Sequence, residues 1–251
     1  MRKKLIAGNW KMHHTVSDSL DFLNVFLSAL PEKPLADILL TPSFPSLFPV
    51  GERLSGYPVQ MAAQNLFFEK KGAYTGEVSA DMLKDCGCQA VIVGHSERRH
   101  VFGESDELIC KKIKAGVVAG LDVVFCIGET GDQRQAGKTE EVIHHQLEEG
   151  LKEFSKDQCK SLIIAYEPVW AIGTDLNATP EQAEEVHRTV RQWVASRFSP
   201  AISETIRILY GGSAKPDNAS DLLARDEIDG LLVGSASLDP QSFCAIIQSV
   251  Q

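Results

Sequence analysis

The chain has 251 residues and a mass of 27.5 kDa, and 43% of its residues are hydrophobic while 24% are charged. This composition is that of an ordinary globular protein, and the length suits one α/β barrel domain spanning residues 1–251. The 34 acidic and 25 basic residues give a net charge of −9. That balance argues against nucleic acid and anionic membranes as partners, since both attract basic surfaces, but it does not exclude a small anionic substrate.

Eight short apolar runs, rich in Val, Ile and Leu, recur along the chain, and each ends in small or polar residues. They cover residues 5–7, 38–40, 59–62, 90–93, 123–127, 162–165, 206–210 and 231–233. Such near-continuous apolar runs are typical of strands that are buried on both faces, as in a parallel sheet.

Most of the gaps between these runs have helical patterns. Residues 18–30 repeat apolar side chains at helical spacing up to Pro31, Thr179 and Pro180 begin a second helix, and Pro216 begins a third. Strand followed by helix, eight times in about 250 residues, predicts an α/β fold, a single-domain (β/α)₈ TIM barrel. A doubly wound open sheet is the alternative, because repetition alone does not close a sheet.

The N-terminus and the cysteines bear on the cellular compartment. Residues 2–4 are basic, but the apolar run after them is too short for a secretory signal peptide, and no stretch reaches the roughly 18 apolar residues of a membrane-spanning helix. The six cysteines, at positions 86, 88, 110, 126, 159 and 244, are interpreted as reduced thiols. No second pair completes a zinc site with Cys86 and Cys88. We therefore expect a cytoplasmic protein without a bound metal.

Polar or glycine-rich motifs follow five of the apolar runs. In a (β/α)₈ barrel the C-terminal ends of the strands meet at one mouth, where catalytic residues lie. This arrangement would bring together Asn9 and Lys11 after the first run, His95 after the fourth and Glu167 after the sixth. Taken singly, each has an ordinary structural explanation, such as a solvated lysine or a hydrogen-bonded histidine. The structural explanations would have to hold at all five strand ends at once, so the motifs together favour a functional site.

Two short motifs suggest other activities and are rejected. Residues 94–96, Gly-His-Ser, begin like the nucleophile elbow of serine hydrolases, but Arg98 occupies a position that requires a small residue. Residues 137–139, Gly-Lys-Thr, end like a nucleotide-binding P-loop, but Asp132 replaces its first glycine. The two histidines at 13–14 are interpreted as surface or packing residues.

Glycine and serine residues follow the last two apolar runs, among them Ser213, Gly234 and Ser235. Backbone N–H groups at these positions of a barrel bind phosphate without adding formal charge, which suits an acidic protein. Lys11 would be the local cation, with one arginine of the pair at 98–99 as a further one. A carboxylate, a histidine and a lysine beside a phosphate site favour proton abstraction next to a carbonyl group over hydrolysis.

Five segments closely resemble the triosephosphate isomerase family, and the likeness runs in order from Asn9 to Leu238. They are residues 9–11, 73–77, 94–99, 165–174 and 210–213. The resemblance implies an isomerase that interconverts dihydroxyacetone phosphate and D-glyceraldehyde 3-phosphate without a cofactor, in glycolysis and gluconeogenesis. Two alternatives stay open: another phosphate-ester-binding barrel enzyme, or a non-catalytic barrel that binds phosphorylated metabolites.

The resemblance also implies a role for each residue at the mouth. Glu167 would be the catalytic base that moves a proton between two neighbouring carbons. His95 would be the catalytic electrophile that polarises the carbonyl group. Lys11, with Asn9, would bind the substrate and stabilise the negative charge on the enediolate oxygen.

The residues after His95 would support it. In the family this histidine is neutral because a helix N-terminus lowers its pKa, and the resemblance implies the same here. Ser96 fits the N-cap of that helix and Glu97 fits its first turn. Glu97 is alternatively the ion-pair partner of Lys11.

Residues 168–178 resemble the family's closing lid, in which Gly173 would donate its N–H to the phosphate. A lid makes chemical sense because an enediolate phosphate exposed to water would lose its phosphate group. The family's far hinge reads Gly-Thr-Gly-Lys, whereas this chain has Asp175 and Leu176 after Gly-Thr, a departure that concerns lid opening and not the chemistry. In the last phosphate loop Ser235 replaces the family's second glycine but keeps the backbone N–H.

Residues 64–82 resemble the long third loop through which members of the family form homodimers. In that arrangement Thr75 would reach toward the active site of the partner. Phe67, Phe68 and Tyr74 would be exposed apolar side chains on this loop in a monomer. We therefore predict a homodimer whose substrate is a small phosphorylated triose.

Overall fold

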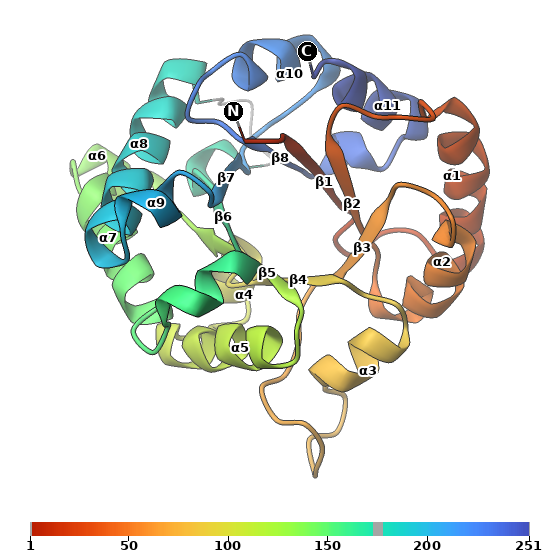
Figure 1. Ribbon diagram of the computed structural model, residues 1–251, viewed down its shortest axis with the longest axis horizontal. Helices are drawn as coiled ribbons and strands as arrows, with labels where there is room; N and C mark the ends of the chain where they lie inside the picture. The colour runs from red at the N-terminus through yellow and green to blue at the C-terminus, as the bar shows by residue number, and fades with distance from the viewer. Residues whose placement is uncertain (1, 173–177, 251) are drawn as a thin grey trace.

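The computed structural model describes residues 2–172 and 178–250. These residues form eight parallel strands that close into a barrel in sequence order, with β8 paired to β1. The strands are β1 Leu5–Asn9, β2 Asp37–Thr41, β3 Gln60–Ala63, β4 Ala90–Val93, β5 Asp122–Ile127, β6 Leu162–Tyr166, β7 Arg207–Tyr210 and β8 Gly230–Val233. Figure 1 shows the ring of strands surrounded by helices. The predicted (β/α)₈ barrel is confirmed, and the open sheet is excluded.

Helices of very different length connect the strands. The α-helices are α1 Val16–Ala29, α2 Leu47–Leu54, α3 Ala80–Asp85, α4 Ser96–His100, α5 Asp106–Val118, α6 Gly131–Gln135, α7 Thr139–Gly150, α8 Pro180–Arg197, α9 Pro200–Ser203, α10 Pro216–Leu223 and α11 Pro240–Gln248. Single turns of 3₁₀ helix form η1 Phe44–Ser46, η3 Val169–Ala171 and η4 Ser235–Ser237, and a longer one forms η2 Lys156–Ser161. The longer helices cover the outside of the barrel, as Figure 1 shows.

The three helices predicted from sequence are present, with one shifted start. Helix α1 begins at Val16, two residues before the predicted start, because Thr15 is its N-cap and forms a capping box with Asp18. Thr179 caps α8 and Pro216 is the first residue of α10, as expected.

Two separate sets of buried side chains hold the barrel together. An inner set of twelve fills the interior: Leu5, Ala7, Leu39, Ala62, Ala90, Ile92, Val124, Cys126, Ile163, Ala165, Leu209 and Leu232. A larger outer set, which includes Ile6, Phe26 and Phe243, lies between the strands and the helices. Side chains alternate between the two sets along a strand, as the pleat requires. Because the interior is packed, a binding cavity has to form at an end of the barrel.

The cysteines and the helices agree with the expectations from sequence. All six cysteines are free thiols, as interpreted. Burial raises the pKa of Cys88 to about 12 and that of Cys159 to about 11, so both are neutral thiols near pH 7. Within residues 2–172 and 178–250, no helix combines the length and the apolar character needed to cross a membrane.

Candidate active site

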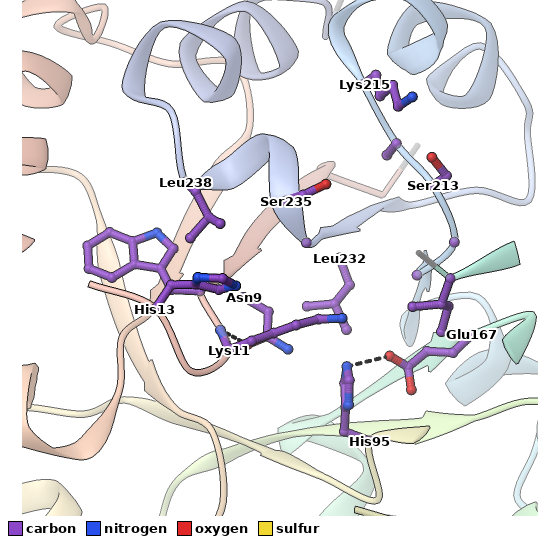
Figure 2. Close-up of a pocket in the computed structure, with 16 residues that line it drawn as sticks. Asn9, Lys11, His13, His95, Glu167, Ser213, Lys215, Leu232, Ser235 and Leu238 are labelled. Atoms are coloured by element: carbon purple, nitrogen blue, oxygen red, sulfur yellow. Dashed lines mark hydrogen bonds and ion pairs between the residues drawn. The ribbon is translucent and has the colours of Figure 1, made fainter. Parts of the chain in front are cut away.

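A cavity of about 360 Å³ opens at the C-terminal ends of the strands. It is lined by Asn9, Trp10, Lys11, His13, His95, Glu167, Ile172, Gly211, Gly212, Ser213, Ala214, Lys215, Leu232, Gly234, Ser235 and Leu238. Seven site residues predicted from sequence are among them, and they follow five different strands (Figure 2). These residues are far apart in the sequence, and the closed barrel brings them together at one end.

The remaining predicted residues lie elsewhere. Ser96 and Glu97 begin helix α4 beside the cavity, and Thr75 is exposed on the loop between β3 and α3. Gly173 lies outside the described residues, as do residues 175–176 of the unusual lid hinge.

Glu167 directly follows β6, and its side chain is almost completely buried. Glycines at the ends of both neighbouring strands make room for it: a Cβ at Gly128 would lie 1.8 Å from its carbonyl oxygen, and one at Gly211 would lie 2.8 Å from its Cγ. Carboxylate Oε2 accepts the N–H of Ser96 at 2.9 Å, and Oε1 lies 2.9 Å from Nε2 of His95. Backbone packing and two polar contacts thus fix a buried carboxylate at the cavity.

The pKa of Glu167 lies below its usual value of 4.5. Burial by itself would raise this pKa. The electrostatic attraction and hydrogen bond of His95, the Ser96 N–H and the Lys11 ammonium favour the charged form and outweigh burial. Glu167 is therefore an ionised carboxylate at neutral pH, which is the form that accepts a proton.

His95 is buried and is itself the N-cap residue of α4. Its Nδ1 accepts the N–H of Glu97 at 3.3 Å. The prediction of Ser96 as the N-cap is wrong, because the imidazole nitrogen takes the capping bond and Ser96 is the first helical residue. With Nδ1 as an acceptor, the neutral ring has its proton on Nε2, the nitrogen that faces Glu167.

The pKa of His95 lies above its usual 6.5 in this geometry. Burial lowers the pKa, but the carboxylates of Glu167 and Glu97 outweigh burial. The lowered pKa expected from the family resemblance is therefore wrong for this arrangement, because that expectation considered the helix N-terminus and not a buried carboxylate 2.9 Å away. The bond from α4 to Nδ1 still opposes protonation of that nitrogen.

Lys11 has a φ of 52°, in the left-handed region that few non-glycine residues adopt. Two hydrogen bonds hold it there: the Lys11 N–H donates to Asn9 Oδ1 at 3.0 Å, and Gln64 Nε2 donates to the Lys11 carbonyl at 2.7 Å. The side chain extends across the cavity in Figure 2, and its Nζ lies 2.8 Å from Oε1 of Glu97. The Lys11–Glu97 ion pair considered from sequence is confirmed. Gln64 was missed, although it directly follows a strand.

Backbone N–H groups line another side of the cavity. Among the described residues, none accepts a hydrogen bond from the N–H groups of residues 212–214 or of Ser235. Gly212 and Ala214 are buried, and buried N–H groups without a protein acceptor are rare. Together with the more exposed N–H groups of Ser213 and Ser235, they form a concave group of donors that favours an anion. In Figure 2 Ser213 and Ser235 lie across Lys11 from the carboxylate and imidazole pair. The cavity therefore has an anion-accepting side and a proton-transfer side.

The arginine pair does not contribute to the cavity. Arg98 Nη2 lies 2.6 Å from the buried carboxylate of Glu104, and Arg99 pairs with Asp106. The expectation of an arginine cation for the phosphate is therefore wrong, because both guanidinium groups are used to fasten α4 to the elements beside it.

Two basic residues at the cavity, His13 and Lys215, were not predicted to be there. Each lies on a strand-end loop, two positions after a predicted site residue. This spacing is the sequence feature from which their place at the cavity could have been predicted. The interpretation of the histidines as surface or packing residues fits His14, whose ring packs edge-on against Trp10 with centroids 4.9 Å apart. It is incomplete for His13, which is exposed but lines the cavity.

Buried Glu129 anchors the chain where it leaves β6. Its Oε1 accepts hydrogen bonds from Tyr166 Oη at 3.1 Å, Trp170 Nε1 at 2.9 Å and Arg134 Nη1 at 3.1 Å. The Arg134 guanidinium also lies over the Trp170 ring, 4.5 Å from its centroid. The described start of the segment that resembles a lid is thus fastened to the barrel.

The closed barrel and this cavity define a class: (β/α)₈-barrel proteins with a site at the C-terminal mouth that presents open N–H groups to an anion. Comparison with known proteins narrows the class. The model of the triosephosphate isomerase family matches residues 4–250, and the chain belongs to this family.

Similar proteins are identical to this chain at nearly half of their positions. The triosephosphate isomerase of Carboxydothermus hydrogenoformans is 48% identical over 248 residues, which cover 99% of each chain. That of Aquifex aeolicus is 48% identical over 247 residues, 98% of this chain and 99% of its own. That of Dictyoglomus thermophilum is 46% identical over 249 residues, 99% of this chain and 100% of its own.

Proposed function

We propose that this protein interconverts dihydroxyacetone phosphate and D-glyceraldehyde 3-phosphate through an enediol(ate), without a cofactor. One observation carries the proposal: an ionised, buried Glu167 and His95 share a cavity with Lys11 and with N–H groups that have no acceptor among the described residues. The family membership and the names of the similar proteins support the same reaction.

Glu167 acts as the base in this proposal. It removes a proton from a carbon next to the carbonyl group and returns it to the neighbouring carbon. Its lowered pKa keeps it ionised, and its burial removes water that would compete for the proton. A positioned side chain that transfers a proton in this way contributes about 10²–10⁴-fold to the rate.

His95 and Lys11 stabilise the oxygen on which negative charge develops. The imidazole donates from Nε2, because Nδ1 is occupied by the N–H of Glu97. Lys11, held by Asn9, adds a positive charge. Both groups are fixed before the substrate arrives, so little reorganisation is needed when the charge forms.

The phosphate binds the N–H groups of residues 212–214 and of Gly234 and Ser235, with Lys11 as the local cation. Donors without formal charge explain how a chain of net charge −9 binds a dianion. We assign Gly173 to the lid as a further N–H donor, and we expect the residues at 175–176 to change the rate of lid opening rather than the chemistry.

We also propose a homodimer that forms through residues 64–82. This loop projects from the outline of the barrel in Figure 1. Within it Met82 and Tyr74 are 54% and 42% exposed, and the Tyr74 ring packs against Phe67 with centroids 4.6 Å apart. An ordered aromatic cluster on a projecting loop supports docking onto a second copy, which would bring Thr75 toward the partner's cavity.

We place this reaction in the cytoplasm, as a step of glycolysis and gluconeogenesis carried out by one domain of residues 1–251. The six free thiols support a reducing compartment. The chemistry of the substrate supports the metabolic assignment, because a triose phosphate is both a product of sugar breakdown and a precursor of sugar synthesis.

A coupled assay tests the proposed function. The purified chain should isomerise glyceraldehyde 3-phosphate, and 2-phosphoglycolate should inhibit competitively because it has the phosphate and an anionic oxygen that resembles the enediolate. A different phosphate-ester enzyme or a non-catalytic binding barrel would bind 2-phosphoglycolate without isomerising the triose phosphate, and that result would overturn the proposal.

A further inference from the structure

One side chain of α10 holds the loop that includes Ser213. Asn218 Nδ2 donates to the Ser213 carbonyl at 3.0 Å, and Asn218 Oδ1 accepts the Lys215 N–H at 2.7 Å. Both polar atoms of the carboxamide therefore bond to the loop backbone, one on each side of Ala214. Asn218 does not line the cavity, so it acts on the cavity only through this loop.

These two bonds fix the peptide units around Ala214. In a trans peptide the C=O and the following N–H point in opposite directions. Because the Ser213 carbonyl is turned toward Asn218, the Ala214 N–H points away from Asn218. Ala214 is buried and lines the cavity, and no described residue accepts its N–H. The carboxamide thus selects a loop conformation in which the Ala214 N–H stays open.

We propose that Asn218 is a positioning residue for the phosphate group of the substrate, because it holds the loop of residues 213–215 in the conformation in which the Ala214 N–H is open to an anion. This inference rests on the proposed function, since it takes the phosphate of the substrate as the ligand of these N–H groups. A loop that is ordered before binding saves the entropy of ordering it on binding, so phosphate affinity rises without added charge.

A purely structural role for Asn218 would use only one of the two bonds. Asn218 is the third residue of α10, and its bond to the Lys215 N–H belongs to the capping of that helix. The bond to the Ser213 carbonyl has no capping role, because that carbonyl precedes the helix and the unsatisfied groups at a helix start are N–H donors. The two roles use different atoms, so different substitutions separate them.

Three variants make the test. Asn218→Ala removes both bonds. Asn218→Asp keeps the acceptor for the Lys215 N–H and loses the donor to Ser213. Asn24→Ala, at an exposed position of α1, is the matched control. For each variant, the inhibition constant of inorganic phosphate, KM and kcat for triose phosphate, turnover of unphosphorylated D-glyceraldehyde and Tm are measured.

We expect Asn218→Ala to raise the inhibition constant of phosphate and the KM for triose phosphate about tenfold and to lower Tm. Turnover of D-glyceraldehyde should stay within about twofold, because that substrate has no phosphate to position. Asn218→Asp should recover Tm but not phosphate affinity, also in roughly 0.5 M KCl, where the added charge is screened. Asn24→Ala should behave as the wild type.

Three results would overturn the inference. One is phosphate inhibition of wild-type strength in Asn218→Ala. The second is recovery of phosphate affinity together with Tm in Asn218→Asp, because capping alone would then explain the loss. The third is an equal loss of turnover on D-glyceraldehyde, which would mean general damage to the site. A wild-type chain that does not isomerise triose phosphate would overturn the proposed function instead, before any variant is compared.

Discussion

The two ends of the barrel use charged side chains in opposite ways. At the N-terminal end, Asp229 is buried between two arginines, with Arg2 Nε at 2.6 Å and Arg191 Nη2 at 2.6 Å, and it also accepts the Ile208 N–H. At the C-terminal end, Glu167 is held by Ser96 and His95 but borders a cavity, and the loop N–H groups of residues 212–214 have no acceptor among the described residues. The same barrel thus has one end whose charges satisfy one another and one end that leaves donors open.

This difference separates stability from chemistry. The partners of a buried carboxylate hold its position and its charged form. Removal of the carboxylate or of a partner leaves an uncompensated charge in the protein interior, which is destabilising. Donors that are left open cost stability unless a ligand binds them. We therefore expect substitutions of side chains that line the cavity to change catalysis with little loss of stability, and substitutions at the N-terminal end to do the reverse.

The largest effect is expected at the C-terminal end. Glu167→Gln keeps the size of the side chain but removes the base, so kcat/KM should fall on the order of 10³-fold while Tm changes little. The coupled assay and a thermal melt measure the two quantities. Glu153→Gln, at an exposed position, is the control and should retain full activity. Near-normal turnover in Glu167→Gln would contradict its assignment as the base.

At the N-terminal end, Asp229→Ala should lower the free energy of unfolding by about 3 kcal/mol, because the buried Arg191 and the partly buried Arg2 each lose a carboxylate partner. The buried Ile208 N–H also loses its acceptor. Denaturant titration measures this loss, and kcat at 25 °C should stay within about twofold. Asp226→Ala, an exposed carboxyl in the same loop, is the control and should change stability by less than about 0.5 kcal/mol. A large loss of kcat with unchanged stability would break the distinction between the two ends.

A smaller effect is expected from His187, which is fully buried near the same end and whose Nδ1 contacts the Glu227 carbonyl at 3.0 Å. Burial lowers its pKa from 6.5 to about 4. Between these values the unfolded chain binds more protons than the folded chain. The stabilisation of the neutral form is therefore fully present above pH 6.5 and falls away toward pH 4, by about 3 kcal/mol.

The check is unfolding by denaturant at several pH values. His187→Asn should flatten the decline in stability between pH 6.5 and 4, although its absolute stability is lower. A decline as steep as that of the wild type would show that other groups cause it.

The smallest effect concerns the proposed dimer. Tyr74→Glu should weaken association at least about tenfold, because a charge replaces an aromatic ring on the projecting loop. Sedimentation equilibrium should give the wild type twice the 27.5 kDa of one chain. A fully active wild-type monomer would contradict the dimer, and Tyr57→Glu, another partly exposed tyrosine, is the matched control.

The barrel could be predicted because strands buried on both faces appear in the sequence as near-continuous apolar runs. In a barrel the C-terminal ends of all strands lie at the same mouth, whatever their distance in the sequence. For the same reason Lys11, His95 and Glu167 could be placed at one mouth. The prediction of an arginine cation at the phosphate site was wrong because it depends on the direction of the side chains. Arg98 and Arg99 lie only three and four positions after His95, yet both point to acidic partners outside the cavity.

Other features depend on contacts that local pattern does not encode. His95 caps its own helix through a ring nitrogen, which no capping preference based on Ser, Thr, Asp and Asn would suggest. Gln64 and Asn218 donate hydrogen bonds to backbone carbonyls, at Lys11 and Ser213. No sequence pattern distinguishes a glutamine or asparagine that makes such a bond from one that does not. The sign of the His95 pKa shift follows from a residue 72 positions away, Glu167.

The central claim is that Glu167 transfers a carbon-bound proton through an enediol(ate), and isomerisation in D₂O tests it most directly. A carboxylic acid at the mouth of the barrel exchanges its proton with solvent, so NMR of the product should show solvent deuterium on the carbon that receives the proton. Glu167→Gln should lose this incorporation together with turnover. Formation of the product by Glu167→Gln at the wild-type rate, with the same deuterium incorporation, would contradict the account, because another group would then transfer the proton.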